Sequence, residues 1–252
     1  MRGGRLAELR HAVRGRLRGD RVTHGVEPVD IAPLVSPLRY DISIRVGLFE
    51  LCERESARRS RDLDDLVEAA RAHAYFTWFR DWVCPRRHPA LLRDSARLDA
   101  AFADRVRRSL ELLDSFRARG LDPARPITLE SGREVLPTDS GKRLAQRLHA
   151  GDGCHRLALL VRSGVRTLAP GTYRVRLRRR LTPLDATHAL LGPLRAPVAD
   201  YVRFLALRYT PGETFTELAA LRSHVRRGSP DALRELDAIV SVDLPLLQGD
   251  AR

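Results

Sequence analysis

One short segment combines backbone and side chains that suit a negatively charged oxygen atom. Its six residues are Gly151, Asp152, Gly153, Cys154, His155 and Arg156. They stand directly before an apolar segment with helical spacing that ends at Gly164. The first N–H groups of a helix have no internal partner and point toward an incoming anion. The segment therefore predicts an anion site at the start of a helix.

The residue types within this segment each have a chemical reason to be there. Gly153 permits close approach of the backbone, and the Asp152 side chain can cap the helix. His155 and Arg156 lie in the first turn, where an imidazole N–H and a guanidinium can donate to phosphate oxygens. The same residues also fit a capped core helix that carries a solvated arginine, and the sequence leaves both interpretations open.

Cys154 admits two interpretations. A thiol at a helix N-terminus beside His155 and Arg156 would have its thiolate favoured by all three features, which is the setting of a reactive cysteine. A small, buried cysteine also fits a helix start without any chemistry. The sequence therefore offers Cys154 either as a nucleophile or as a packing residue.

Phosphoryl transfer would need a carboxylate to orient or deprotonate an acceptor hydroxyl. Asp41, Glu50 and Glu130 lie at or near the ends of expected strands, which could face the glycine segment. Any of the three could serve as that base. The alternative for each of the three is an ordinary surface charge.

Three further groups could bind a ligand. Cys84 and His88 are spaced like half a zinc site, but no second pair follows at a fitting distance. Aromatic residues at helical spacing could stack a base or form core; they are Tyr75, Phe76, Trp78, Phe79 and Trp82. Alternating arginines could line a pocket or face solvent; they are Arg174, Arg176 and Arg178.

The elements that must position these residues are helices and short strands. Asp62 predicts the N-cap of a helix that Pro85 ends, and Gly120 caps a second helix over residues 98–116. A basic helix is expected over residues 1–24. Strands are expected over residues 25–31, 40–46, 127–129 and 172–177. A turn is expected over 131–134, a short helix or loop over 139–149, and helices over 198–205, 215–225 and 233–240.

Composition narrows the class of protein. The chain has 252 residues, 43% of them hydrophobic, which is enough for a real core, and a net charge of +13 that favours phosphate-bearing partners. Three scattered cysteines do not indicate a disulfide framework. No signal-peptide pattern and no membrane-length apolar stretch is present in the sequence, so we expect a cytoplasmic protein without a membrane partner.

The strand Pro126-Ile127-Thr128-Leu129, the segment from Gly151 to Ala158 and Gly164 together resemble the ParB/sulfiredoxin superfamily. Members of that superfamily share a strand, a D-G-x-H-R-like turn and a helix that ends near a glycine. The resemblance covers residues 125–180, with a weaker similarity over residues 26–41. Two features depart from the family: the segment between Leu129 and Gly151 is longer, and no helix-turn-helix DNA reader follows.

The resemblance implies an α/β (α+β) fold with a small mixed sheet. It also implies a bound nucleotide, ATP or ADP, together with Mg²⁺. Its phosphates would lie at the helix start, against the matching motif residues Gly153, His155 and Arg156. Sulfiredoxins place a reactive cysteine directly before His-Arg, where Cys154 stands. Family kinases supply a carboxylate after the first strand, and Asp41 matches by position, so the resemblance implies Asp41 as the preferred base.

We therefore expect a basic arm over residues 1–24, a ParB/sulfiredoxin-like domain over 25–182 with a helical insertion at about 60–120, and a helical extension over 183–252. The leading hypothesis is a nucleotide-dependent phosphotransferase acting on a small molecule. The alternatives are a ParB-like nucleic-acid-associated or regulatory nucleotide-binding protein and a sulfiredoxin-like thiol enzyme that uses Cys154. Because these activities occur on one fold, fold alone does not decide among them.

Overall fold

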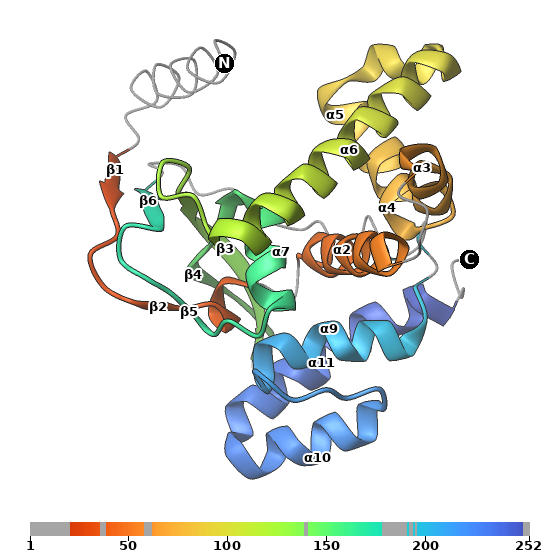
Figure 1. Ribbon diagram of the computed structural model, residues 1–252. Helices are drawn as coiled ribbons and strands as arrows, with labels where there is room; N and C mark the ends of the chain where they lie inside the picture. The colour runs from red at the N-terminus through yellow and green to blue at the C-terminus, as the bar shows by residue number, and fades with distance from the viewer. Residues whose placement is uncertain are drawn as a thin grey trace.

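The computed structural model describes residues 21–35, 39–57, 62–138, 141–177, 191, 194 and 196–248. These residues form a mixed α/β structure, as the sequence predicts. In Figure 1 the sheet lies on one side of the molecule, and helix α7 (Cys154–Arg162) lies against both the sheet and helix α2 (Asp41–Ala57). Helix α7 therefore connects the sheet to the helical part of the molecule.

The main sheet is small and mixed. Its strands, in order across the sheet, are β1 (Arg21–His24), β6 (Tyr173–Leu177), β3 (Ile127–Thr138) and β4 (Gly141–Asp152). Strand β1 runs antiparallel to β6, β6 parallel to β3, and β3 antiparallel to β4. Two further short strands, β2 (Val29–Asp30) and β5 (Thr167–Leu168), pair separately. The strand expected over residues 172–177 is confirmed.

The N-terminal predictions are only partly correct. Residues 21–24 form the edge strand β1 and not the end of a helix, because the β-branched Val22 and Thr23 extend the backbone into register with β6. The other residues of that expected helix, 1–20, lie outside the described residues. Of residues 25–31, only Val29 and Asp30 form a strand.

Residues 40–46 were expected to be extended, but from Asp41 onward they form the first turns of helix α2. Ile42, Ile44, Leu48 and Phe49 are all buried, since α2 packs against α7 and against helices from the 62–119 region. A helix that is buried on nearly all sides has no single apolar stripe. The short alternation in this segment therefore mimics a strand.

The helix expected from Asp62 is broken into shorter pieces. Asp62 caps α3 (Leu63–Arg71) by accepting from Asp64 N at 2.9 Å, as predicted. His73 then caps α4 (Ala74–Trp78), which continues through a π-helical turn (Phe79–Val83) into α5 (Cys84–Arg87). Pro85 does not end the helix, because it stands in the first turn of α5, where its missing N–H costs nothing.

After a 3₁₀ turn (Pro89–Arg93), the long helix α6 (Ser95–Arg119) covers the second predicted helix. Gly120 follows it with φ of 71°, which confirms the predicted C-cap. The residues that face the core along α6, such as Phe102, Val106 and Leu113, recur with helical spacing. The periodicity of this segment was therefore a reliable guide.

Strands β3 and β4 pair as a hairpin, so the turn expected over 131–134 is wrong, and so is the helix or loop expected over 139–149 where the structure describes it, from residue 141 onward. Residues 139 and 140 lie outside the described residues. The pairing runs from Thr128 opposite Asp152, with a shift of register before Leu129, to Thr138 opposite Gly141. Strand β4 is an edge of the sheet, where polar residues are well tolerated. A polar run therefore has the composition of a loop although cross-strand hydrogen bonds make it a strand.

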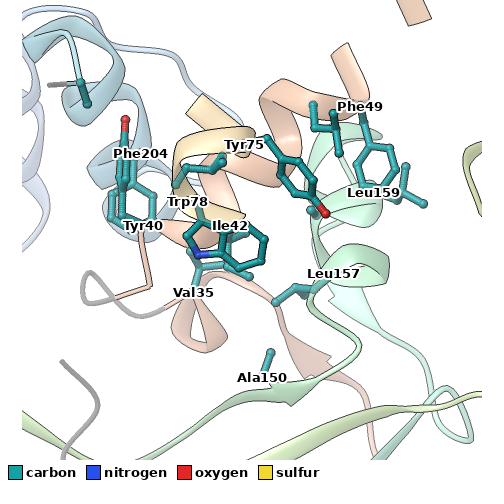
Figure 2. Packing of buried hydrophobic residues seen from close by; sticks show 14 of the residues in the cluster. Val35, Tyr40, Ile42, Phe49, Tyr75, Trp78, Ala150, Leu157, Leu159 and Phe204 are labelled. Carbon is teal, nitrogen blue, oxygen red and sulfur yellow. The ribbon is translucent and has the colours of Figure 1, made fainter. Parts of the chain in front are cut away.

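The C-terminal region is helical, as predicted, with α9 (Val198–Tyr209), α10 (Leu218–Gly228) and α11 (Pro230–Gln248). These helices share the core of the rest of the molecule: the Tyr40 ring lies 5.1 Å from the Phe204 ring on α9. Figure 2 shows this contact and the buried residues around Tyr75 and Trp78. Across the described residues, no helix has both the length and the apolar character that a membrane span requires.

Candidate functional site

The glycine segment makes the transition from β4 to α7. Gly153 has φ of 81°, a left-handed conformation that favours glycine, and α7 begins at Cys154. The first hydrogen bond of the helix runs from Leu157 N to Gly153 O at 2.9 Å. The amides of residues 154–156 therefore have no acceptor within the helix. After α7, Gly164 has φ of 71°, which agrees with the predicted end of this helix.

Asp152 does not cap α7 as predicted. Its carboxylate accepts from the Gly153 amide at 2.7 Å, and the side chain stays exposed. Within the described part of the chain, no side chain caps this helix. The amide of Gly153 is thus already used, whereas the next three amides at the start of α7 stay open to a ligand.

The glycine segment opens onto a cleft with a volume of about 1210 Å³. All five residues predicted to bind a nucleotide line it: Gly151, Asp152, Gly153, His155 and Arg156. The three residues predicted to be catalytic, Asp41, Cys154 and His155, line it too. The opposite wall comes from α4, α5 and α6. The structure therefore brings the predicted site residues together.

The charge of this cleft is strongly positive. Among the described residues, nine arginines line it, against four carboxylates: Arg39, Arg45, Arg86, Arg87, Arg105, Arg107, Arg108, Arg125 and Arg156, with Asp41, Asp104, Glu111 and Asp152. A concave surface lined by one sign of charge concentrates ligands of the other sign. The cleft is therefore suited to an anion.

Asp41 lies at the start of α2 and not at a strand end. Arg39 Nε and Nη2 donate to its two carboxylate oxygens at 2.8 and 3.0 Å, and Arg45 Nη1 donates to Oδ2 at 2.5 Å. Burial alone would raise the pKa of Asp41, but the two guanidinium groups hold it well below its usual range. A carboxylate so strongly stabilised as an anion is a poor proton acceptor, so the geometry disfavours Asp41 as the base.

Arg39 also contacts the start of α7. Its Nη2 donates to Cys154 Sγ at 3.0 Å, and its Nη1 donates to the Ala150 carbonyl at 2.5 Å. The thiol of Cys154 lies 3.7 Å from the same carbonyl and is only partly buried. A guanidinium N–H against the sulfur is a donor that a sulfur anion would accept. This contact keeps the nucleophile interpretation of Cys154 open.

His155 is held by two residues from other helices. Its Nε2 lies 2.7 Å from the Tyr75 hydroxyl, which accepts from Arg105 Nε at 2.8 Å. Figure 2 shows the Tyr75 hydroxyl directed away from Trp78 toward α7. Because Arg105 donates to the hydroxyl oxygen, we assign the hydroxyl proton to the bond with Nε2, which places the ring proton of His155 on Nδ1.

His155 is an uncharged imidazole in this setting. Burial lowers its pKa well below the usual value, and the positive charges of Arg45 and Arg105 lower it further. The Nδ1–H has no partner among the described residues. It is therefore a hydrogen-bond donor that remains available to a ligand.

Arg156 lies over Gly153, so that a Cβ at position 153 would come within 3.0 Å of Arg156 Nη2. Its Nη1 is buried and, within the part of the chain that the structure describes, has no hydrogen-bond partner. Burial lowers the pKa of this guanidinium, which nevertheless stays charged at neutral pH. Arg156 is thus a partly desolvated cation at the start of α7.

The aromatic residues divide between core and cleft. Tyr75, Trp78 and Phe79 are buried, and Phe76 and Phe79 pack against Phe102, as a core requires. Trp78, Phe79 and Trp82 also line the cleft. The Arg86 guanidinium carbon lies over the Trp82 ring, 3.3 Å from the ring centroid. Because Trp82 is only partly buried, whereas Trp78 and Phe79 are buried, it is the cleft-lining ring of this group best placed to stack against a flat ligand.

Other predicted candidates lie elsewhere. Glu50 is exposed and pairs with Arg162, and Glu130 pairs with Arg176 at 3.1 Å. Arg174 donates to Thr128, so these strand arginines serve the sheet and do not line the cleft; Arg178 lies outside the described residues. Over the described residues, no group of three or more His, Cys, Asp or Glu could hold a metal ion, and this includes Cys84 and His88.

Sequence reasoning missed Arg39, Arg45 and Arg105. The chain is rich in arginine, so no individual arginine stands out, and these three contact residues up to 115 positions away. Tyr75 was identified only as an aromatic residue. Its contact with His155, 80 positions along the chain, leaves no local signal.

Comparisons with protein-family models, with curated proteins and with solved structures find no match. The functional inference therefore depends on the geometry and charge of the cleft.

Proposed function

We propose that the chain is a nucleotide-dependent phosphotransferase of the ParB/sulfiredoxin type that acts on a small molecule. The observation that carries this proposal is the uncapped start of α7 opening onto a cleft in which nine arginines face four carboxylates. Free helix amides, the Nδ1–H of His155 and the guanidinium of Arg156 form a donor set for phosphate oxygens. Trp82, on the α5 side, would contact the base.

A nucleotide with Mg²⁺ fits the residues that are present. Asp152 lies beside the free amides and makes no ion pair within the described residues. Magnesium in phosphoryl-transfer sites keeps several waters and is bound through one or two carboxylates and the phosphates. Asp152 is thus the carboxylate that would hold it, and the metal would supply charge neutralisation during the transfer.

The structure changes the expected role of Asp41. Both of its oxygens are engaged by arginines, so we assign it to orient Arg39 and Arg45 in place of proton abstraction. Phosphoryl transfer depends mostly on positioning and on stabilising charge on the transferred group. The arginines and amides of the cleft supply both, so the proposal does not require a strong carboxylate base.

The test is thermal unfolding of the full chain with ATP, ADP or CTP. A nucleotide that binds the folded state raises the midpoint as its concentration increases. Arg156→Gln should weaken binding about tenfold, because a charge-assisted contact is lost. Arg162→Gln is the matched control, since it lies on the same helix, is exposed, pairs with Glu53 and does not line the cleft. No shift with any nucleotide contradicts the proposal.

Thiol chemistry through Cys154 is the second candidate, favoured by the Arg39 contact at 3.0 Å from the sulfur. Cys154→Ser should then abolish activity while nucleotide-induced stabilisation is retained. If the serine variant keeps its activity, the thiol has only a packing role. A DNA mobility shift that weakens steeply with salt would instead indicate the nucleic-acid alternative.

A further inference from the structure

The floor of the cleft holds a second group of donors, away from the glycine segment in the sequence. We define the floor cluster as Arg45 on α2, Trp78 on α4 and Arg105 on α6. All three line the cleft, and Arg45 and Trp78 are only 6% and 3% exposed. The Arg45 and Arg105 guanidinium carbons lie 4.3 and 5.2 Å from the centroid of the Trp78 ring. One indole therefore brings two cations together.

The charges around the floor cluster do not balance. Asp41 is the carboxylate that faces it, and Asp41 is shared between Arg39 and Arg45. Arg105 donates to the uncharged Tyr75 hydroxyl, and His155 is neutral. Arg39 and Arg45 thus share one carboxylate, and the half-buried Arg105 beside Trp78 makes no ion pair among the described residues. Uncompensated buried charge is costly, and a bound anion would remove that cost.

Two donors in the floor cluster are also unpaired. Arg45 Nε and Trp78 Nε1 are buried and have no hydrogen-bond partner among the described residues. Native proteins rarely leave buried donors unsatisfied, because each such group costs free energy. Two unpaired donors beside excess positive charge are the arrangement expected of a site for an oxygen anion.

We propose that the floor cluster binds the oxyanion group, a carboxylate or a phosphate, of the small molecule that accepts the phosphoryl group. This substrate class rests on the proposed function, but the existence of the anion subsite does not. Arg156 and the amides of α7 would hold the nucleotide, and the floor cluster would hold its co-substrate in the same cleft. The acceptor is accordingly an anionic metabolite and not a neutral one.

Tryptophan offers a direct test, because the chain has only two, Trp78 and Trp82. In Trp82→Phe the indole N–H signal of a ¹H–¹⁵N spectrum comes from Trp78 alone. We would titrate this variant with inorganic phosphate and, separately, with acetate, against sodium chloride at matched ionic strength. The proposal expects a saturable downfield shift of the signal with at least one of the two oxyanions and none with chloride. A signal unmoved by both, or moved equally by chloride, overturns it.

Variants then assign the shift to the floor cluster. Arg105→Gln and Arg45→Lys, each in the Trp82→Phe background, should weaken the oxyanion about tenfold. Arg119→Gln, at the far end of α6 and outside the cleft, should leave it unchanged. Unchanged affinity in both floor variants overturns the assignment. If phosphate or acetate binds normally while no nucleotide stabilises the protein, the proposed function fails and the anion subsite stands.

Discussion

The two ends of the cleft are built in different ways. The α7 end comes from contiguous residues, 151–156, whose geometry is set by one left-handed glycine and by free amides. The floor comes from α2, α4 and α6, and its members are positioned by side-chain contacts across the core. A site of the first kind can be inferred from a short motif. One of the second kind exists only after the fold has formed.

The largest effect should come from Arg39, which connects the two ends. Arg39→Gln removes the bonds to Asp41, Ala150 and Cys154 together. We expect a loss of about 3 kcal/mol in the free energy of unfolding, because a buried ion pair loses one partner. Urea unfolding measures it. Arg162→Gln, which breaks only the surface pairs with Glu50 and Glu53, should cost about 1 kcal/mol or less. Equal losses in both variants would show that Arg39 does not connect the two ends.

An intermediate effect should appear in the pH dependence of stability. The pKa of His155 is lowered in the folded state, so below about pH 6.5 the unfolded chain binds a proton that the folded chain does not. Stability should therefore fall as pH decreases from about 6.5, by up to about 1.4 kcal/mol per pH unit from this residue. Burial and the charge of Arg54 also lower the pKa of His73. The wild type must therefore be compared with His155→Gln, in which the slope of the free energy of unfolding against pH should be smaller by the contribution of one proton. An unchanged slope would mean that His155 is charged in the fold.

Tyr75→Phe sharpens the same point. Without the hydroxyl, Nε2 loses its fixed donor, so the preference for a proton on Nδ1 should disappear from the ¹⁵N spectrum of His155. Tyr40→Phe is the matched control, because its ring packs against Phe204 and does not contact His155. If His155 carries its proton on Nε2 in the wild type, the assigned hydrogen-bond direction is wrong.

The smallest effect should be the difference in nucleotide binding between substitutions at the two glycines that flank α7, Gly153 and Gly164. Gly153→Ala and Gly164→Ala both place a side chain at positive φ, which costs about 1 kcal/mol each. At position 164 the new Cβ meets open space, whereas at position 153 it comes within 3.0 Å of Arg156. Thermal unfolding should therefore show similar losses, and only Gly153→Ala should also weaken nucleotide binding. Equal nucleotide affinity in the two variants would show that Arg156 is not part of the anion site.

Whether the sequence predicted an element correctly depends on how far apart in the chain the residues that determine it lie. Asp62, Gly120 and the helical spacing of α6 act within a few residues, and all of them behave as predicted. The hairpin β3–β4 depends on pairing between residues up to 24 positions apart. Its polar composition therefore led to a wrong prediction of a turn and a helix or loop. Helix α2 is buried on most sides, which removes the periodicity that would have marked it.

The candidate site shows the same division. The sequence placed the residues of the glycine segment correctly at a helix start that opens onto a cleft. It could not show that Asp152 turns to the Gly153 amide or that arginines occupy both oxygens of Asp41, because these depend on side-chain direction and on distant partners. The floor cluster had no local signal, since arginines occur throughout the chain and its members come from three separate helices.

The bonds of Arg39 have a consequence for dissection of the chain. A peptide limited to residues 121–177 would contain the whole glycine motif, yet it would lack Arg39, Tyr75 and Arg105, which contact Cys154 and His155 from outside that stretch. The imidazole would be free to rotate and to take up a proton, and the sulfur would lose its guanidinium neighbour. Excising the motif would thus keep its amino-acid sequence but remove the contacts that position Cys154 and His155.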